Sequence, residues 1–215
     1  MNFLNRLERK LGWLSIERLP MYVVTAQALI YIWGKMNPDN LHWLALDPQA
    51  IIYGHEYWRL ITFLFITPLQ NPLFAFFFLY LLFVYGEALE QAWGSFRLTL
   101  FFLIGAIGTM IGGLFFQSYD GAFYLNTSIF LAFAAVHPDF QVYLFFVIPV
   151  KVKWLAWVTW AYFIYVLFLL PISAKMGLIV SLANYLLFFG KHHVEYTAQL
   201  IAQYRRRQRF KNSLD

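Results

Sequence analysis

The chain has 215 residues, of which 61% are hydrophobic, 21% are aromatic and only 13% are charged. A soluble domain carries about 25% charged residues, so this composition, with its mean hydropathy of +0.58, indicates a membrane protein whose surface faces lipid. The chain has no cysteine, which excludes disulfides, thiolate metal sites and a cysteine nucleophile.

Positive charge collects at the two ends of the chain, and the net charge is +5. We predict a basic amphipathic cytoplasmic segment over residues 1–18 and a basic cytoplasmic tail over 191–215, which contains "RRRQRFK". This distribution is typical of two cytoplasmic termini under the positive-inside rule. We expect the tail to bind anionic lipid headgroups, and we expect no nucleic-acid partner.

Six apolar segments are candidate membrane spans, since a span needs about 20 mainly apolar residues. In chain order they cover residues 19–36, 69–89, 97–117, 121–136, 154–170 and 174–190. They predict an all-α polytopic membrane domain over residues 19–190, with the lipid bilayer as its first partner. With both termini inside, all but three of the 16 Lys and Arg residues are cytoplasmic, and the three outside are Lys35, Arg59 and Lys175.

The sequence also predicts two structured connectors between the spans. Residues 37–68 are too polar to span a membrane and too aromatic for a free linker, so we expect a folded outer loop lying partly in the interface. Residues 141–154 contain a β-branched and aromatic run that is followed by Pro149 and two lysines. This pattern favours an extended or half-embedded cytoplasmic connector.

The third candidate span carries glycines at Gly105, Gly108 and Gly112. Small residues let membrane helices approach closely, because packing drives their association. We favour a helix packed within its own bundle, and a dimerisation face is the alternative.

Three polar residues lie inside the apolar fourth span, at Asn126, Thr127 and Ser128. For Ser128 we favour a hydroxyl that bonds the carbonyl one turn earlier. The alternatives are a contact with the sixth helix and a catalytic role. We also predict that Asn126 and Asn184 face one another as a reciprocal amide pair.

Three stretches resemble the rhomboid superfamily, which includes intramembrane serine proteases and the catalytically inert derlins. They are "HEYWRLITFLFITP" (55–68), "YGEALEQAWGSFRLTLFF" (85–102) and "HPDFQVYLFFVIPVKVKWLAW" (137–157). The residues that match family motifs are Trp58, Arg59, Glu90 and Gly94. The resemblance covers residues 55–190 and implies a six-helix rhomboid-like bundle with a folded first outer loop.

The catalytic residues that the resemblance calls for are missing. A rhomboid protease uses a serine in a GxSG motif on the fourth helix and a histidine on the sixth, because a hydroxyl needs an adjacent base to become a nucleophile. Its oxyanion donors lie on the second helix. Counting from "YGEALEQAWGS" and comparing the sixth helix, the matching positions here are Phe74, Phe78, Asn126 and Ser181. No histidine lies between His137 and His192.

Other titratable residues predict structure rather than chemistry. Glu87 and Glu90, near the cytoplasmic end of the second span, suit a structural role at a helix end. Two clusters contain potential metal ligands, His55 with Glu56 and His192–His193 with Glu195. Neither shows the three or four convergent ligands of a metal site, so we expect no metal and no cofactor.

We therefore expect a catalytically inactive, derlin-like protein that binds transmembrane segments of partner or client proteins as an adaptor, chaperone or complex subunit. One alternative is an intramembrane serine protease that uses Ser128 or Ser181 without histidine. A second alternative is a small transporter or channel subunit. We favour a prokaryotic cytoplasmic membrane as the location, with the endoplasmic reticulum as the alternative.

Overall fold

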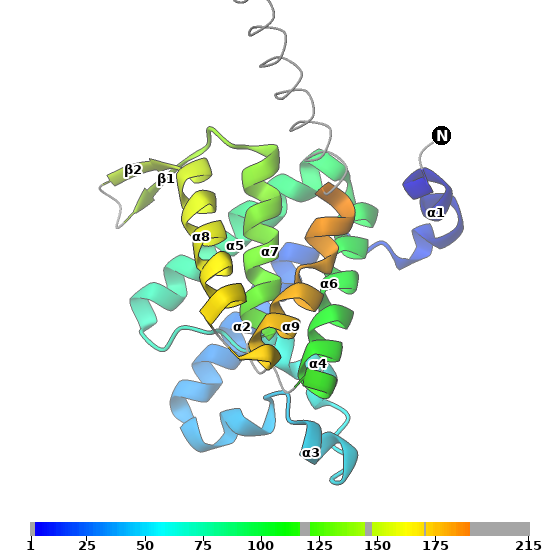
Figure 1. The fold of residues 1–215 in the computed structure, drawn as a ribbon, viewed down its shortest axis with the longest axis vertical. Helices are drawn as coiled ribbons and strands as arrows, with labels where there is room; N and C mark the ends of the chain where they lie inside the picture. Colours follow the sequence, from blue (N-terminus) through cyan, green and yellow to red (C-terminus); the bar gives the residue numbers. More distant parts are fainter. Residues whose placement is uncertain (1–2, 117–120, 145–147, 170, 190–215) are drawn as a thin grey trace, which may run out of the picture.

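The computed structural model describes residues 3–116, 121–144, 148–169 and 171–189 (Figure 1). Its helices are α1 (Phe3–Leu11), α2 (Leu19–Met36), α3 (Pro48–Ile52), α4 (Arg59–Thr62), α5 (Pro72–Trp93), α6 (Ser95–Phe116), α7 (Gly121–Val136), α8 (Val152–Leu169) and α9 (Ile172–Ser181). The 3-10 turns are η1 (Gly12–Leu14), η2 (Pro38–Trp43) and η3 (Phe63–Phe65), and the strands are β1 (Gln141–Leu144) and β2 (Ile148–Lys151). After a turn at Leu182, residues 183–189 are helical again.

The predicted all-α polytopic membrane bundle is confirmed in its class. Within the described residues, α5, α6 and α8 are long and apolar enough to cross a membrane, and α7 is apolar but shorter. α2 has the bounds expected for the first span, and α9 lies within the sixth. That the chain has six membrane spans stays a prediction. The basic tail at 191–215 also stays a prediction, because it lies outside the described residues.

α5 differs from its expected bounds at both ends, for local reasons. Asn71 caps the helix, because its Oδ1 accepts hydrogen bonds from the backbone N–H groups of Leu73 (2.9 Å) and Phe74 (3.4 Å). Pro72 then occupies the first helical position, where its fixed φ and missing N–H are tolerated. At the other end Gly94 has φ +83°, a left-handed value that favours glycine. The helix therefore runs from residue 72 to 93 instead of 69 to 89.

α7 lies at the centre of the bundle, where it packs against α5, α6, α8 and α9 (Figure 1). Its side chains are accordingly buried on several sides, as at Tyr124, Ile129, Ala132 and Phe133. A helix that is apolar around its whole circumference suits such a central position.

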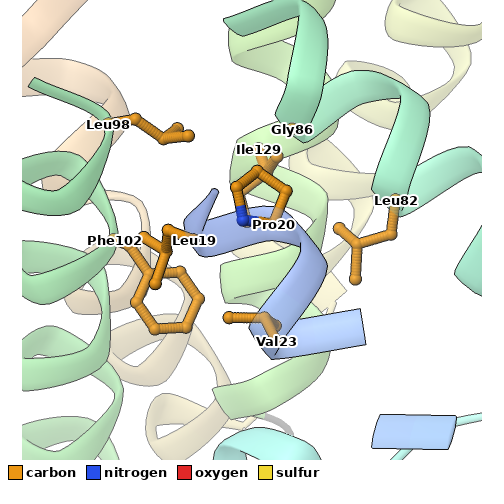
Figure 2. A pocket seen from close by; sticks show the side chains of 8 residues that line it. All are labelled: Leu19, Pro20, Val23, Leu82, Gly86, Leu98, Phe102 and Ile129. Carbon is orange, nitrogen blue, oxygen red and sulfur yellow. The ribbon is translucent and has the colours of Figure 1, made fainter. Parts of the chain in front are cut away.

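α2 enters the bundle through a close contact with α5. A Cβ added to Gly86 of α5 would lie only 2.6 Å from Cβ of Pro20, so the glycine permits this approach. Figure 2 shows Pro20 next to Gly86, with Leu19 and Val23 on the same helix facing a small apolar cavity. The start of α2 is thereby packed closely against α5.

The outer loop of residues 37–68 is folded, as predicted, and Arg59 organises it. Arg59 is 5% exposed. Its guanidinium pairs with the carboxylate of Glu56 at 2.5 Å and donates to the backbone carbonyls of Ala45 (3.0 Å) and His42. The indole of Trp58 donates to the carbonyl of Trp43 at 3.2 Å. These bonds supplement the short helices η2, α3, α4 and η3 in satisfying the backbone of the loop.

The connector after α7 is extended, as predicted, and forms a two-stranded antiparallel hairpin. Gln141 of β1 pairs with Lys151 of β2, and Leu144 pairs with Ile148. At its base, Asp139 accepts hydrogen bonds from Lys153 at 3.0 Å and Lys151 at 3.2 Å.

Candidate functional site

A buried polar contact joins α7 to the helical segment 183–189 in the middle of the apolar bundle. The side-chain amide of Asn184 donates to the hydroxyl of Ser128 at 2.9 Å, and both residues are fully buried. Ser128 donates its own proton to the carbonyl of Leu125 at 2.7 Å. The hydroxyl is therefore satisfied both as a donor and as an acceptor.

Asn184 is also fully engaged at this site. Its Nδ2 donates a second hydrogen bond to the carbonyl of Phe101 on α6 at 3.3 Å, and its Oδ1 accepts from the N–H of Tyr185 at 2.8 Å. One side chain thus links three helical segments, α6, α7 and residues 183–189. In an apolar interior such a satisfied network fixes one arrangement of the helices.

The favoured interpretation of Ser128 is confirmed, and the predicted amide pair of Asn126 and Asn184 is wrong. Asn184 bonds to Ser128 instead, and the buried Nδ2 of Asn126 has no hydrogen-bond partner among the described residues. The physical reason is helical geometry. Residues two apart lie about 200° apart around a helix, so Asn126 and Ser128 cannot both face Asn184.

The polarity of the contact decides what chemistry Ser128 can perform. A serine nucleophile gives its proton to a neighbouring base, whereas here the neighbour is an amide nitrogen, which donates a proton and has no basic lone pair. The serine proton points to a backbone carbonyl, which is not a general base. The arrangement therefore holds Ser128 as an acceptor and does not activate it.

Gly105 of α6 makes room for this contact. A Cβ at this position would lie 2.4 Å from Cδ1 of Leu125 and 2.5 Å from Nδ2 of Asn184. Gly108 and Gly112 are buried on the same helix. The expectation that these glycines serve packing within the bundle is confirmed for Gly105, which lies directly against α7 and the last helical segment.

Three other positions were also matched to the rhomboid site. Phe74 is 44% exposed near the start of α5, and Phe78 is half-buried against the hydrophobic core. Ser181 is the last residue of α9, and its side chain lies outside the described residues. The assignment of Phe74, Phe78, Asn126 and Ser181 to lost catalytic positions stays a prediction.

Glu90 has the structural role at a helix end that the sequence predicts. Its Oε1 accepts from the backbone N–H of Arg18 at 2.8 Å and from the hydroxyl of Ser95 at 2.6 Å. The carboxylate thus joins the start of α2 to the turn between α5 and α6, next to Gly94.

No group of three or more His, Asp or Glu side chains that could hold a metal occurs in the part of the chain that the structure describes. The imidazole of His55 lies 3.0 Å from the hydroxyl of Tyr57, and Glu56 is paired with Arg59.

Several helices present large apolar side chains outward, and α5 and α8 are among them. On α5 the exposed residues are Leu73, Phe74, Phe76, Tyr80 and Phe83. On α8 they include Trp154, Trp157, Tyr165 and Phe168. Only 17% of the apolar stretch of α8 is buried inside the protein, compared with 50% for α6. Both surfaces suit contact with lipid or with another membrane helix.

Comparison with known proteins assigns the chain to a family. The model of the family described as eukaryotic integral membrane protein (DUF1751) matches residues 18–211. The chain belongs to this family. Derlin-1 of Drosophila melanogaster is 25% identical over 180 residues, which cover 81% of this chain and 73% of that protein. The resemblance to derlins within the rhomboid superfamily is thereby confirmed.

Membership of this family changes one expectation. The family is described as eukaryotic, which conflicts with the prokaryotic membrane that we favoured. That preference depended on the shortness of the chain, a feature that carries no information about the host membrane. The prediction of a multi-pass integral membrane protein is confirmed.

The Ser128–Asn184 contact was only partly accessible from the sequence of this DUF1751 family member. A bond from Ser128 to the sixth helix was one alternative, since a buried hydroxyl seeks a partner. The choice of Asn184 as that partner depends on the rotation of two helices about their axes, which the close approach at Gly105 helps to set.

Proposed function

We propose that the protein is a catalytically inactive, derlin-like membrane protein that binds transmembrane segments of other proteins as an adaptor, chaperone or complex subunit. The observation that carries the proposal is the Ser128–Asn184 contact. At the interface of α7 and residues 183–189, the amide of Asn184 donates a hydrogen bond to Ser128. Hydrolysis would need a base at that point.

The binding function is supported by the two outward apolar surfaces on α5 and α8. α8 packs on α7 and α9, and most of its apolar stretch is left uncovered by the protein. The exposed aromatic residues include Phe76 on α5 and Trp157 and Tyr165 on α8. Helices associate in membranes through side-chain packing rather than through a hydrophobic driving force, so a client helix can replace lipid at such a surface.

The test uses site-specific photocrosslinking in the native membrane. A photoreactive residue is placed at Phe76 of α5, at Tyr165 of α8 and, as a matched control, at Ile107 of α6, which is also exposed. The proposal expects crosslinks from the first two positions to transmembrane peptides of other proteins, and lipid adducts only from the control. Equal protein crosslinking from all three positions would contradict a binding surface on α5 and α8.

The protease alternative is tested on the same protein. A fluorophosphonate probe labels an activated serine and ignores one whose proton is held by a carbonyl. We expect no labelling of the wild-type chain, and therefore no difference in Ser128→Ala or Ser181→Ala. Labelling that disappears in either variant, together with cleavage of a membrane substrate, would replace the proposal by the alternative.

We also propose that both termini face the cytoplasm, in a eukaryotic internal membrane such as the endoplasmic reticulum. The distribution of Lys and Arg supports this orientation. Because the chain has no cysteine, single substitutions such as Glu17→Cys and Tyr53→Cys can be probed with an impermeant maleimide. Selective labelling of the residue-17 variant from the cytosolic side is expected, and labelling of residue 53 from that side would contradict the orientation.

A further inference from the structure

A cavity of about 240 Å³ opens where the end of α2 meets the segment that leads into α5. Its polar lining comes from Tyr31, Lys35, Thr67 and Gln70, and apolar side chains such as Leu41 and Leu69 supply the remaining walls. The buried hydroxyl of Thr67 has no hydrogen-bond partner among the described residues. The hydroxyl of Tyr31 donates to the backbone carbonyl of Gln70 at 2.9 Å, which joins the two sides. We call this space the α2 cavity.

The α2 cavity is positively charged. The ammonium of Lys35 lies 5.5 Å from the centre of the Tyr31 ring and forms no salt bridge with any side chain that the structure describes. None of the lining residues is acidic. Because none of the salt bridges among the described residues involves Lys35, its ammonium retains the capacity to bind an anion.

Exposed tryptophans at the end of α2 and in η2 indicate that the cavity lies at the depth of phospholipid headgroups. It is formed by the last turns of α2 together with residues 66–70, and Trp33 of α2 and Trp43 of η2 are exposed. Tryptophans are enriched at the boundary between hydrocarbon and water. Leu29 and Ile32, exposed on the preceding turns of α2, provide an apolar surface for a chain that leaves the cavity.

The volume limits what can enter. Sites for complete drug-sized molecules measure about 300–1,000 Å³, so a cavity of about 240 Å³ accommodates one end of a larger molecule. A headgroup with a negative charge beside a glycerol backbone matches the charged and apolar halves of the lining.

We propose that the α2 cavity binds the phosphate group of a membrane phospholipid, with Lys35 as its cationic ligand. This inference is independent of the proposed binding of client helices, because it concerns the outer end of α2 and not the exposed faces of α5 and α8.

The test is native mass spectrometry of the full chain in detergent, titrated with phosphatidylglycerol. Diacylglycerol with the same acyl chains serves as the phosphate-free control, and inorganic phosphate serves as the lipid-free control. We expect saturable binding of phosphatidylglycerol that is about tenfold weaker in Lys35→Gln. We expect Lys35→Arg to restore binding and Lys175→Gln, a lysine predicted to lie on the same side of the membrane, to leave it unchanged.

Several results would overturn the proposal. Equal affinity of the wild-type chain and Lys35→Gln would remove the lysine from the site, and equal affinity for diacylglycerol would remove the phosphate. Saturable binding of inorganic phosphate without binding of phosphatidylglycerol would show a site for a free anion instead. No adduct with any probe would show a cavity that holds only water. Lys35 is exposed, so its variants are expected to fold, and an unchanged circular dichroism spectrum verifies this.

Discussion

The amide of Asn184 and the hydroxyl of Ser128 form a hydrogen bond of 2.9 Å between two apolar helical segments. In a catalytic pair the serine donates its hydrogen bond to the base. Here the serine oxygen accepts the hydrogen bond from Asn184. A serine buried in a membrane helix is thus used here to hold two helices together.

The strength of this contact can be measured with a double-mutant cycle of Ser128→Ala and Asn184→Ala. Hydrogen bonds between membrane helices contribute about 0.6 kcal/mol on average, so we expect a coupling free energy of this order in unfolding from mixed micelles. Asn184→Ala alone should cost more than Ser128→Ala, because it also removes the bond to the carbonyl of Phe101. Strictly additive effects would contradict a direct contact.

A side chain at position 105 should displace the side chains of Leu125 and Asn184. In Gly105→Ala the new Cβ would meet Leu125 and Asn184 at 2.4 and 2.5 Å, and overpacking of this kind costs about 1–3 kcal/mol. The thermal midpoint of the purified protein provides the measurement. Gly12→Ala is the matched control, since its Cβ would have no neighbour within 4 Å, and an equal loss in both variants would refute the packing role.

Replacement of Arg59 should unfold the loop of residues 37–68 and leave the helical bundle folded. The guanidinium is buried and serves Glu56 and two backbone carbonyls, and removing one partner of a buried ion pair costs about 3–5 kcal/mol. Limited proteolysis of Arg59→Gln should cut within residues 37–68 faster than in the wild type. Glu56→Gln keeps an acceptor oxygen and should have a smaller effect, and the reverse order would contradict this account.

Glu90 should stabilise the protein through the hydrogen bonds that its Oε1 accepts. Oε1 accepts from Arg18 and Ser95, whereas Oε2 is buried without a hydrogen-bond partner among the described residues. Glu90→Gln preserves an acceptor and should lower stability little, while Glu90→Ala loses both bonds at a cost of about 1–3 kcal/mol. Hydrogen exchange at the start of α2 measures the difference, and equal exchange in both variants would show that the acceptor is not needed.

The hairpin base should respond to acid. Hydrogen bonds from Lys153 and Lys151 hold the pKa of Asp139 below its usual range. A lowered pKa means that the ion pair is complete above the ordinary unfolded value of about 3.9 and is lost as the pH falls through the lower folded value. A carboxyl carbon titration by NMR should place the midpoint of Asp139 below that of an exposed aspartate. In Asp139→Asn the acid-dependent exchange of the hairpin amides should disappear.

Hydropathy was sufficient to predict the helical bundle, because lipid requires that each span satisfy its own backbone. It was less successful for α5, whose start is set by Asn71 and Pro72. This Asn-Pro pair is a readable helix-start signal, but the apolar residues before it obscured the boundary. The folded loop could be anticipated from its aromatic residues, whereas the position of Arg59 against the carbonyls of His42 and Ala45 required the tertiary structure.

The candidate site was predictable in its residue types and less so in its pairing. Ser128 and Asn184 are conspicuous polar residues in apolar helices, so a contact with a neighbouring helix was foreseeable. Which residue of α7 contacts Asn184 depends on the rotation of α7 about its axis. Ser128 and Asn126 are two residues apart and therefore point in different directions.

The bond between Arg18 and Glu90 also has a consequence for the order of events during synthesis. The two residues are 72 positions apart, and a ribosome adds roughly 5–20 residues per second, so the start of α2 waits roughly 4–14 seconds for its acceptor. Asn184 emerges another 94 positions after Glu90. α2 is therefore made before the carboxylate that accepts from its start, and α6 and α7 are made before the amide that links them. The helices can reach their final packing only after residue 184 has been synthesised.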